Sequence, residues 1–240
     1  MSDVLSPPPH PLLYDLLRRW QRGWVLARDL GVPEEVGGAL RVPVHGHGRR
    51  WEFLVADPDG TSAAVRRLAG EVSAAPRRDW LTVVTGAPDT VALTMHRAGL
   101  RLSDGEEFLM ACRLDGQPVV PAAAPYRVRT RVEGAVVRVR VLAPDGGEAA
   151  SGAMAVAGAD AVADRITTAP AHRRRGLGRT VMGALAERAR DLGAREGLLV
   201  ASEQGRHLYG SLGWREHAHV VIGATPHGMA AGEADGSPAA

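Results

Sequence analysis

The sequence contains no lysine and no asparagine, so all 29 of its Lys and Arg positions are arginine. Alanine, arginine and glycine are abundant, and a coding bias toward GC-rich codons accounts for both absences. The missing lysine still has a chemical consequence, because no lysine side chain can act as a nucleophile in this protein.

Cysteine is also scarce, since Cys112 stands alone. A single cysteine excludes an intramolecular disulfide, and reduced thiols are typical of the cytoplasm. The first residues, MSDVLSPPPHP, contain no basic segment followed by an apolar one, so they do not resemble a secretion signal. The apolar runs are far shorter than a membrane-spanning helix. We therefore expect a cytoplasmic protein without a membrane partner.

The net charge of +2 is small for a chain of 240 residues, which argues against a nucleic-acid partner. The charge is nevertheless unevenly distributed. Between residues 165 and 190 there are seven arginines and a single acidic residue, Glu187. This stretch predicts a local positive site.

Composition divides the chain into five segments. The proline-rich residues 1–11 and the aperiodic residues 223–240 predict flexible ends. A break rich in proline and alanine at residues 116–125 predicts a linker. The linker separates an N-terminal α/β lobe, residues 12–115, from a second domain, residues 126–222.

Hydrophobic patterning predicts an α/β fold in which both halves share one order of elements. In the first half, a short helix at residues 12–20 precedes strand, helix, strand, helix and strand, at residues 50–56, 61–72, 79–85, 88–100 and 107–114. After the linker, alternation with glycine-containing turns predicts an antiparallel meander at residues 125–134, 136–142 and 148–156. The order strand, helix, strand, helix, strand then returns at residues 160–168, 176–193, 197–202, 203–213 and 214–222.

The segment ITTAPAHRRRGLGR, residues 166–179, joins a predicted strand to a predicted helix. The start of a helix presents unpaired backbone N–H groups and the positive end of the helix dipole. Gly176 and Gly178 would let the backbone approach a ligand closely, and the neighbouring arginines would donate charge-assisted hydrogen bonds. The segment therefore predicts a site for a pyrophosphate.

Two other nucleotide-binding patterns do not fit. The phosphate loop of nucleoside triphosphatases needs a lysine, which this chain lacks. The dinucleotide fingerprint needs a third glycine, and that position holds Val181. The remaining pattern is Arg-x-x-Gly-x-Gly, at residues 173–178.

In its strand and helix context, this hexapeptide resembles the motif of the GNAT superfamily of acetyl-CoA-dependent N-acetyltransferases. The segment LYGSLGW, residues 208–214, resembles the family's second motif at the expected distance downstream. The resemblance covers residues 126–222 and implies a mixed, mostly antiparallel central sheet flanked by helices and preceded by the smaller lobe.

The resemblance also implies roles for individual residues. Backbone groups of Ile166, Thr167 and Thr168 would align the pantetheine arm and thioester of acetyl-CoA like an added strand. Tyr209 would protonate the departing thiolate, and Ser202 stands where many members have asparagine. The remaining cofactor-binding residues lie in the loop that would hold the pyrophosphate, namely Arg173, Arg174, Arg175, Gly176, Leu177, Gly178 and Arg179.

An attacking amine must first lose a proton, so the reaction needs a base. Asp164 on the fourth strand and Glu196 at the start of the fifth are candidates, and neither matches a family position firmly. Cys112 lies outside the matched region and receives no role.

The first half resembles a degenerate GNAT-like lobe that would shape the acceptor site. It lacks the glycine loop, and ADPDGTSAAVRRL, residues 56–68, offers acidic residues where the arginines would be. An independent fold of this half would refute the idea.

Two histidine pairs, His45 with His47 and His217 with His219, alternate as residues on one face of a strand do. No third ligand stands at suitable spacing, so we expect no metal site.

The resulting prediction is an N-acetyltransferase that takes acetyl-CoA and the amine of a small molecule, peptide or protein. A non-catalytic acyl-CoA sensor is the alternative from another class, and a toxin that acetylates tRNA is a third option, which predicts an extended basic surface. Acetylation of its own lysines is excluded. The acceptor stays open, and so does a homodimer.

Overall fold

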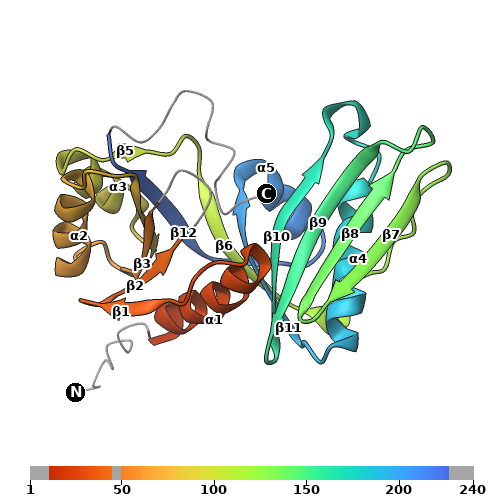
Figure 1. Ribbon diagram of the computed structural model, residues 1–240, viewed down its shortest axis with the longest axis horizontal. Coiled ribbons are helices and arrows are strands. Elements are labelled where there is room, and N and C mark those ends of the chain that lie inside the picture. Colours follow the sequence, from red (N-terminus) through yellow and green to blue (C-terminus); the bar gives the residue numbers. More distant parts are fainter. Residues whose placement is uncertain (1–10, 45–49, 227–240) are drawn as a thin grey trace, which may run out of the picture.

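The computed structural model describes residues 11–44 and 50–226 (Figure 1). The helices are α1 (Pro11–Arg28), α2 (Ala63–Ser73), α3 (Pro88–Arg97), α4 (Leu177–Asp191) and α5 (Glu203–Gly210), with 3-10 turns η1 (Leu114–Gly116) and η2 (Pro170–His172). The strands are β1 (Glu34–Val36), β2 (Ala39–Pro43), β3 (Trp51–Ala56), β4 (Asp79–Thr85), β5 (Arg101–Leu102), β6 (Glu107–Arg113), β7 (Arg127–Glu133), β8 (Val136–Leu142), β9 (Glu148–Ala157), β10 (Asp160–Thr168), β11 (Glu196–Ser202) and β12 (Arg215–Ala224).

The strands form one mixed sheet in the order β1-β2-β3-β4-β12-β6-β11-β10-β9-β8-β7, and β5 pairs with β12. Two neighbouring pairs are parallel, β3 with β4 and β10 with β11, and the other pairings are antiparallel. A helix connects the two strands of each parallel pair, α2 in the first half and α4 in the second. The expected α/β fold, with a mostly antiparallel sheet and the same order of elements in both halves, is confirmed.

The two halves exchange their closing strands. Strand β6 comes from the first half but lies between β11 and β12 of the second, and β12 pairs with β4 of the first half. Each half therefore completes its part of the sheet with a strand of the other. The first half is therefore not an independent fold. This agrees with the hypothesis of a degenerate GNAT-like lobe, which an independent fold would have refuted.

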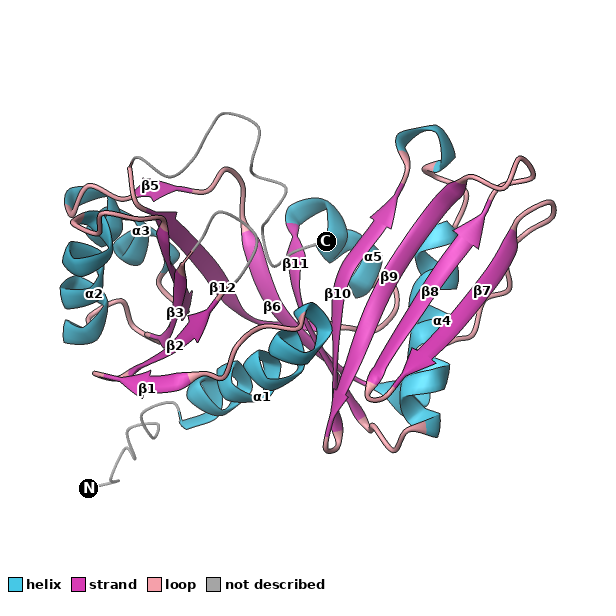
Figure 2. Ribbon diagram, in the orientation of Figure 1, coloured by secondary structure: helices cyan, strands magenta, loops and turns pink. Residues whose placement is uncertain are grey.

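Among the described residues, α1 covers one face of the sheet, and α2, α3, α4 and α5 cover the opposite face (Figure 2). Residues along each strand point alternately to the two faces, so they contribute alternately to the cores on the two sides of the sheet. On β8, Val137, Val139 and Val141 are buried in the core beneath α4. On β10, Val162 faces α1, where Gly23 permits close packing because a Cβ there would lie 2.4 Å from a Val162 methyl carbon. Helix α1 thus spans both halves of the sheet.

Several predicted boundaries are wrong. The first helix continues to Arg28 instead of ending at Trp20, because packing on the sheet outweighs the poor helix propensity of Gly23. Strands β1, β2 and β5 were not predicted from the pattern. Strand β12 continues to Ala224, so it includes the first residues of the predicted C-terminal tail. Residues 1–10 and 227–240 lie outside the described part of the chain.

The predicted linker at residues 116–125 packs against α4 and the turn after α5. Gln117 is buried, its side chain donates to the Leu212 carbonyl at 2.8 Å, and it accepts from the Trp214 indole at 3.1 Å. Gly183 on α4 leaves room for this segment, because a Cβ there would lie 2.6 Å from the Pro118 carbonyl oxygen. The segment therefore fixes the turn that follows α5.

No helix in the described ranges, 11–44 and 50–226, is long and apolar enough to cross a membrane.

Candidate active site

The candidate site begins where the two central parallel strands of the second half separate. β10 and β11 pair only through residues Asp160–Val162 and Glu196–Leu198. Beyond these residues, β10 pairs with β9 and β11 pairs with β6. A cavity of about 750 Å³ lies at the open end of this gap. Its size is within the range of roughly 300–1,000 Å³ that is common for small-molecule sites.

The N-terminus of α4 opens into this cavity. Gly176 is the N-cap residue with a φ of +78°, a backbone conformation that favours glycine, and no side chain caps the helix. The first backbone bond of the helix runs from the Thr180 N–H to the Gly176 carbonyl, so the N–H groups of the preceding turn have no partner within the helix. Such an end attracts an anion.

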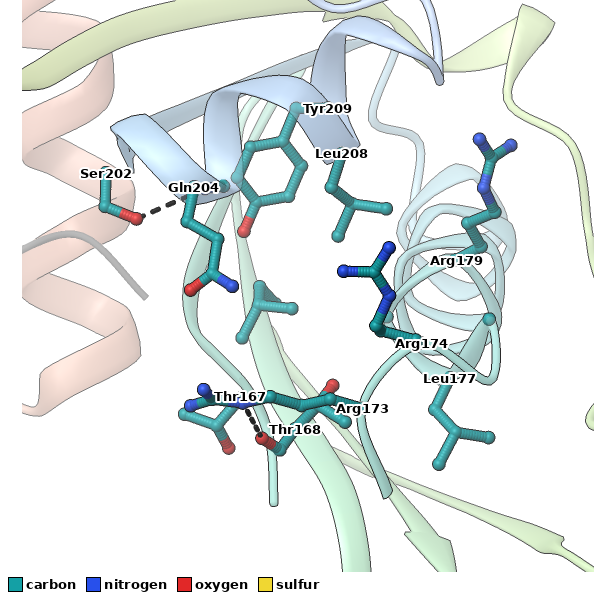
Figure 3. Close-up of a pocket in the computed structure, with 14 residues that line it drawn as sticks. Thr167, Thr168, Arg173, Arg174, Leu177, Arg179, Ser202, Gln204, Leu208 and Tyr209 are labelled. Carbon is teal, nitrogen blue, oxygen red and sulfur yellow. Dashed lines mark hydrogen bonds between the residues drawn. The ribbon is translucent and has the colours of Figure 1, made fainter. Parts of the chain in front are cut away.

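The arginines of the loop have different orientations. In Figure 3, the Arg174 side chain points toward the cavity centre beside Leu208. Arg173 donates to the Thr168 carbonyl at 3.3 Å, and Arg179 donates to the Ser211 hydroxyl at 2.8 Å. Arg174 is therefore the arginine best placed to meet a bound anion.

Tyr209 lies on α5 with its hydroxyl directed into the gap between α5 and the end of β10 (Figure 3). Only 2% of the residue is exposed, and burial raises the pKa of its phenol, with a further increase from the negative charge of Asp164. A tyrosine already keeps its proton at neutral pH, and burial favours the protonated form further, so the phenol can act as a donor. Ser202 caps α5 by accepting from the Gly205 N–H at 3.2 Å, so its side chain is occupied by the helix it starts.

Most of the residues expected to bind the cofactor surround this one cavity. Its lining includes Ile166, Thr167, Thr168, Arg173, Arg174, Gly176, Leu177, Gly178, Arg179 and Ser202. Arg175 is exposed and does not line it. Sequence reasoning missed Gln204, Gly205 and Leu208, although all three lie between Ser202 and Tyr209 on a helix with a predicted site residue at each end.

Asp164 is engaged by a buried ion pair. The Arg28 guanidinium donates to both of its carboxylate oxygens, at 2.8 and 2.9 Å. The two side chains are only 6% and 1% exposed. Because the carboxylate already has a bidentate partner on α1, the expectation that Asp164 acts as the base does not fit its surroundings.

Glu196 lies at the opposite end of β11 from the cavity. Six residue steps separate it from Ser202, which corresponds to roughly 20 Å along a strand. Arg19 on α1 bridges Glu196 and Asp160, and this raises the pKa of the guanidinium, Asp160 having the larger effect. Glu196 therefore anchors α1 to the sheet and is too distant to be the expected base.

The corresponding place in the first half is closed. β3 and β4 remain paired along all of β3, and the Gly86 N–H then donates to the Pro58 carbonyl at 3.1 Å. The buried carboxylate of Asp57 accepts from the Ser62 N–H at 3.2 Å, and the Ser62 hydroxyl caps α2. The side chains of Asp57 and Ser62 thus occupy the N-terminus of α2, whereas no side chain caps the N-terminus of α4.

The described pair of histidines, His217 and His219, does not share one face of its strand. A β-bulge between Glu216 and Ala218 interrupts the predicted alternation, so that His217 is exposed while the His219 ring lies 5.0 Å from that of Phe108. His45 and His47 lie outside the described residues. Within the described ranges, no group of three His, Cys, Asp or Glu side chains could hold a metal ion.

Part of the second half is similar to a known protein family. Residues 136–216 match the family model for the acetyltransferase (GNAT) domain. This segment of the second half is therefore similar to the acetyltransferase (GNAT) domain. No curated protein sequence matches the chain.

Solved structures share the fold over most of the chain. A GCN5-related N-acetyltransferase from Kribbella flavida is 16% identical with a TM-score of 0.64, over 90% of this chain and 96% of that one. A tandem GNAT protein from the clavulanic acid biosynthesis pathway is 16% identical with a TM-score of 0.54, over 82% of each chain. A GCN5-related N-acetyltransferase from Sphaerobacter thermophilus is 14% identical with a TM-score of 0.54, over 78% of this chain and 76% of that one. These likenesses extend the GNAT-like fold to the N-terminal half.

Proposed function

We propose that the chain is an N-acetyltransferase that transfers the acetyl group of acetyl-CoA directly to a primary amine of a small molecule, peptide or protein. The observation that carries the proposal is the cavity between β10 and β11, which is bounded by the uncapped N-terminus of α4 and by the side chain of Tyr209.

The residues of the cavity fit acetyl-CoA, which would supply the acetyl group as a thioester. The open N-terminus of α4 and the Arg174 guanidinium suit the pyrophosphate. The side of β10 that faces away from β9 has no partner strand at Ile166–Thr168 among the described residues. This edge can bind an amide-containing arm as a neighbouring strand would, although use of the Thr168 carbonyl would require Arg173 to release it.

Protons must move during the reaction. The neutral amine forms a bond to the acetyl carbon, the carbon–sulfur bond breaks, and the Tyr209 hydroxyl gives its proton to the departing sulfur. The proton that the attacking nitrogen loses as the amide forms then restores the Tyr209 phenol. The amine must lose a proton first, and the described residues that line the cavity include no Asp, Glu or His. That proton would therefore leave through water or to a group outside the lining.

The test is calorimetric titration with acetyl-CoA, followed by thiol release with a panel of amines and peptides. Arg174→Gln and Arg175→Gln form a matched pair, because both remove one charge and only Arg174 lines the cavity. We expect Arg174→Gln to weaken acetyl-CoA binding by at least about tenfold, the value of one charge-assisted hydrogen bond, and Arg175→Gln to change it little.

Equal losses in the two variants would indicate general charge attraction instead of a site. Failure of the wild-type protein to bind acetyl-CoA would overturn the proposal, and binding without turnover would favour the acyl-CoA sensor.

A further inference from the structure

Five arginines gather on one side of the two outermost strands of the second half. We call this surface the arginine face; it consists of Arg127, Arg129 and Arg131 on β7 and Arg138 and Arg140 on β8. All five are exposed.

The strand register places these side chains together. Arg129 pairs with Arg140, and Arg131 pairs with Arg138. The alternate residues of β8 point to the opposite side, where they are buried beneath α4. Because side chains alternate along a strand, the five arginines share the other side of the sheet.

No helix of the described chain covers this surface. Helix α1 packs on the same side of the sheet but over β9 and β10, and α4 lies behind the strands (Figures 1 and 2). The floor beside the arginines is made of small residues, since Ser151 pairs with Arg140 and Ala153 pairs with Arg138. The result is a flat and basic surface.

The positive charge of this surface is only partly balanced. Glu133 contacts Arg131 and Arg138 at 2.8 and 3.6 Å, and Glu148 contacts Arg140. Arg127 and Arg129 form no ion pair with any other described residue. Like charges directly opposite each other destabilise a sheet, and a bound anionic group would relieve that repulsion.

The arginine face is continuous with the candidate active site. Arg140 pairs with Ser151, and Ser151 pairs with Thr167, which lines the cavity. Two strand spacings therefore separate Arg140 from Thr167, roughly 10 Å. The hydroxyls of Ser151 and Thr167 lie 3.2 Å apart and join the two sites across β9 and β10.

We propose that the arginine face binds an acidic polypeptide segment and that this segment carries the amine to be acetylated. The inference rests on the proposed function and adds the acceptor class. Alternate arginines on β7 lie roughly 7 Å apart, which matches the spacing of carboxylates on one side of an extended peptide. The arginine face contains no aromatic side chain on which bases could stack, so a single-stranded nucleic acid fits it less well.

The test uses fluorescence anisotropy at low salt. The probes are a peptide of alternating glutamate and serine with a free N-terminal amine, the same peptide with glutamine for glutamate, and a single-stranded RNA. The variant is Arg127→Gln/Arg129→Gln, which removes no ion pair of the fold. Arg77→Gln/Arg97→Gln, two exposed arginines of the first half, is the charge-matched control.

We expect the acidic peptide to bind, and the first variant to weaken its binding by about three- to tenfold while the control leaves it unchanged. With this peptide as acceptor, KM should rise by the same factor at constant kcat, whereas turnover of the glutamine peptide should not change.

The inference would be overturned if the two double variants bound the acidic peptide equally well, or if the wild-type protein did not bind it. Tighter binding of the RNA than of the acidic peptide would indicate a nucleic-acid partner instead. Anisotropy does not depend on turnover. Absence of acetyl-CoA binding by calorimetry would therefore refute the proposed function without deciding the role of the arginine face.

Discussion

Substitution of Asp164 distinguishes a structural role from a catalytic one. In Asp164→Asn, the Arg28 guanidinium keeps its charge inside the protein but loses its bidentate partner. Removing one member of a buried ion pair costs about 3–5 kcal/mol. For a chain of this size, 1 kcal/mol shifts the melting temperature by roughly 2–4 °C, so the expected decrease is roughly 6–20 °C.

Thermal unfolding followed by circular dichroism measures this effect. The double variant Arg28→Met/Asp164→Leu should recover most of the loss, because neither buried charge then remains. Arg188→Met is the control, since its ion pair with Asp191 on α4 is about half exposed, and it should shift the transition much less. If Asp164→Asn retained its melting temperature but lost turnover, our assignment of Asp164 to the ion pair would be wrong.

Three further outcomes are expected. Tyr209→Phe should lower kcat by about 10²–10⁴-fold at nearly constant acetyl-CoA affinity, and unchanged turnover would remove Tyr209 from the mechanism. Gly176→Val should impair acetyl-CoA binding in calorimetry, because a φ of +78° is strained for a β-branched residue, whereas Gly70→Val in open space on α2 should not. Burial raises the pKa of Cys112 to about 12. Iodoacetamide at pH 8 should therefore modify this thiol roughly 10³-fold more slowly in the folded than in the unfolded protein. The modification rate of the folded protein should increase as the pH rises toward 12. Equal rates in the two states would show that the thiol is accessible.

Local sequence was sufficient to predict the loop at the start of α4. Gly176 and the arginines before it are neighbours in the chain, and the helix that follows has an amphipathic pattern. Apart from β1, β2 and β5, the order of strands and helices in both halves could be predicted for the same reason, because periodicity is a local property.

Contacts between distant segments could not be predicted. Arg28 and Asp164 are 136 residues apart, so no spacing in the sequence shows that the carboxylate is paired with an arginine. Gln117 lies in a stretch rich in proline and alanine, and its role depends on Leu212 and Trp214, which the fold brings to it. The five arginines of β7 and β8 were part of a predicted meander, but the sequence does not show that α1 packs over β9 and β10 and leaves them uncovered by any described helix.

The exchange of closing strands affects how the chain can fold during synthesis. Strand β4 pairs with β12, and the paired residues Val84 and Val220 stand more than a hundred residues apart. Until β12 has emerged from the ribosome, β4 presents an edge without its neighbour, and such edges are prone to pair with other chains. Long sequence separation also slows the formation of native contacts. We therefore expect productive folding to be largely post-translational and to depend on protection of the nascent first half.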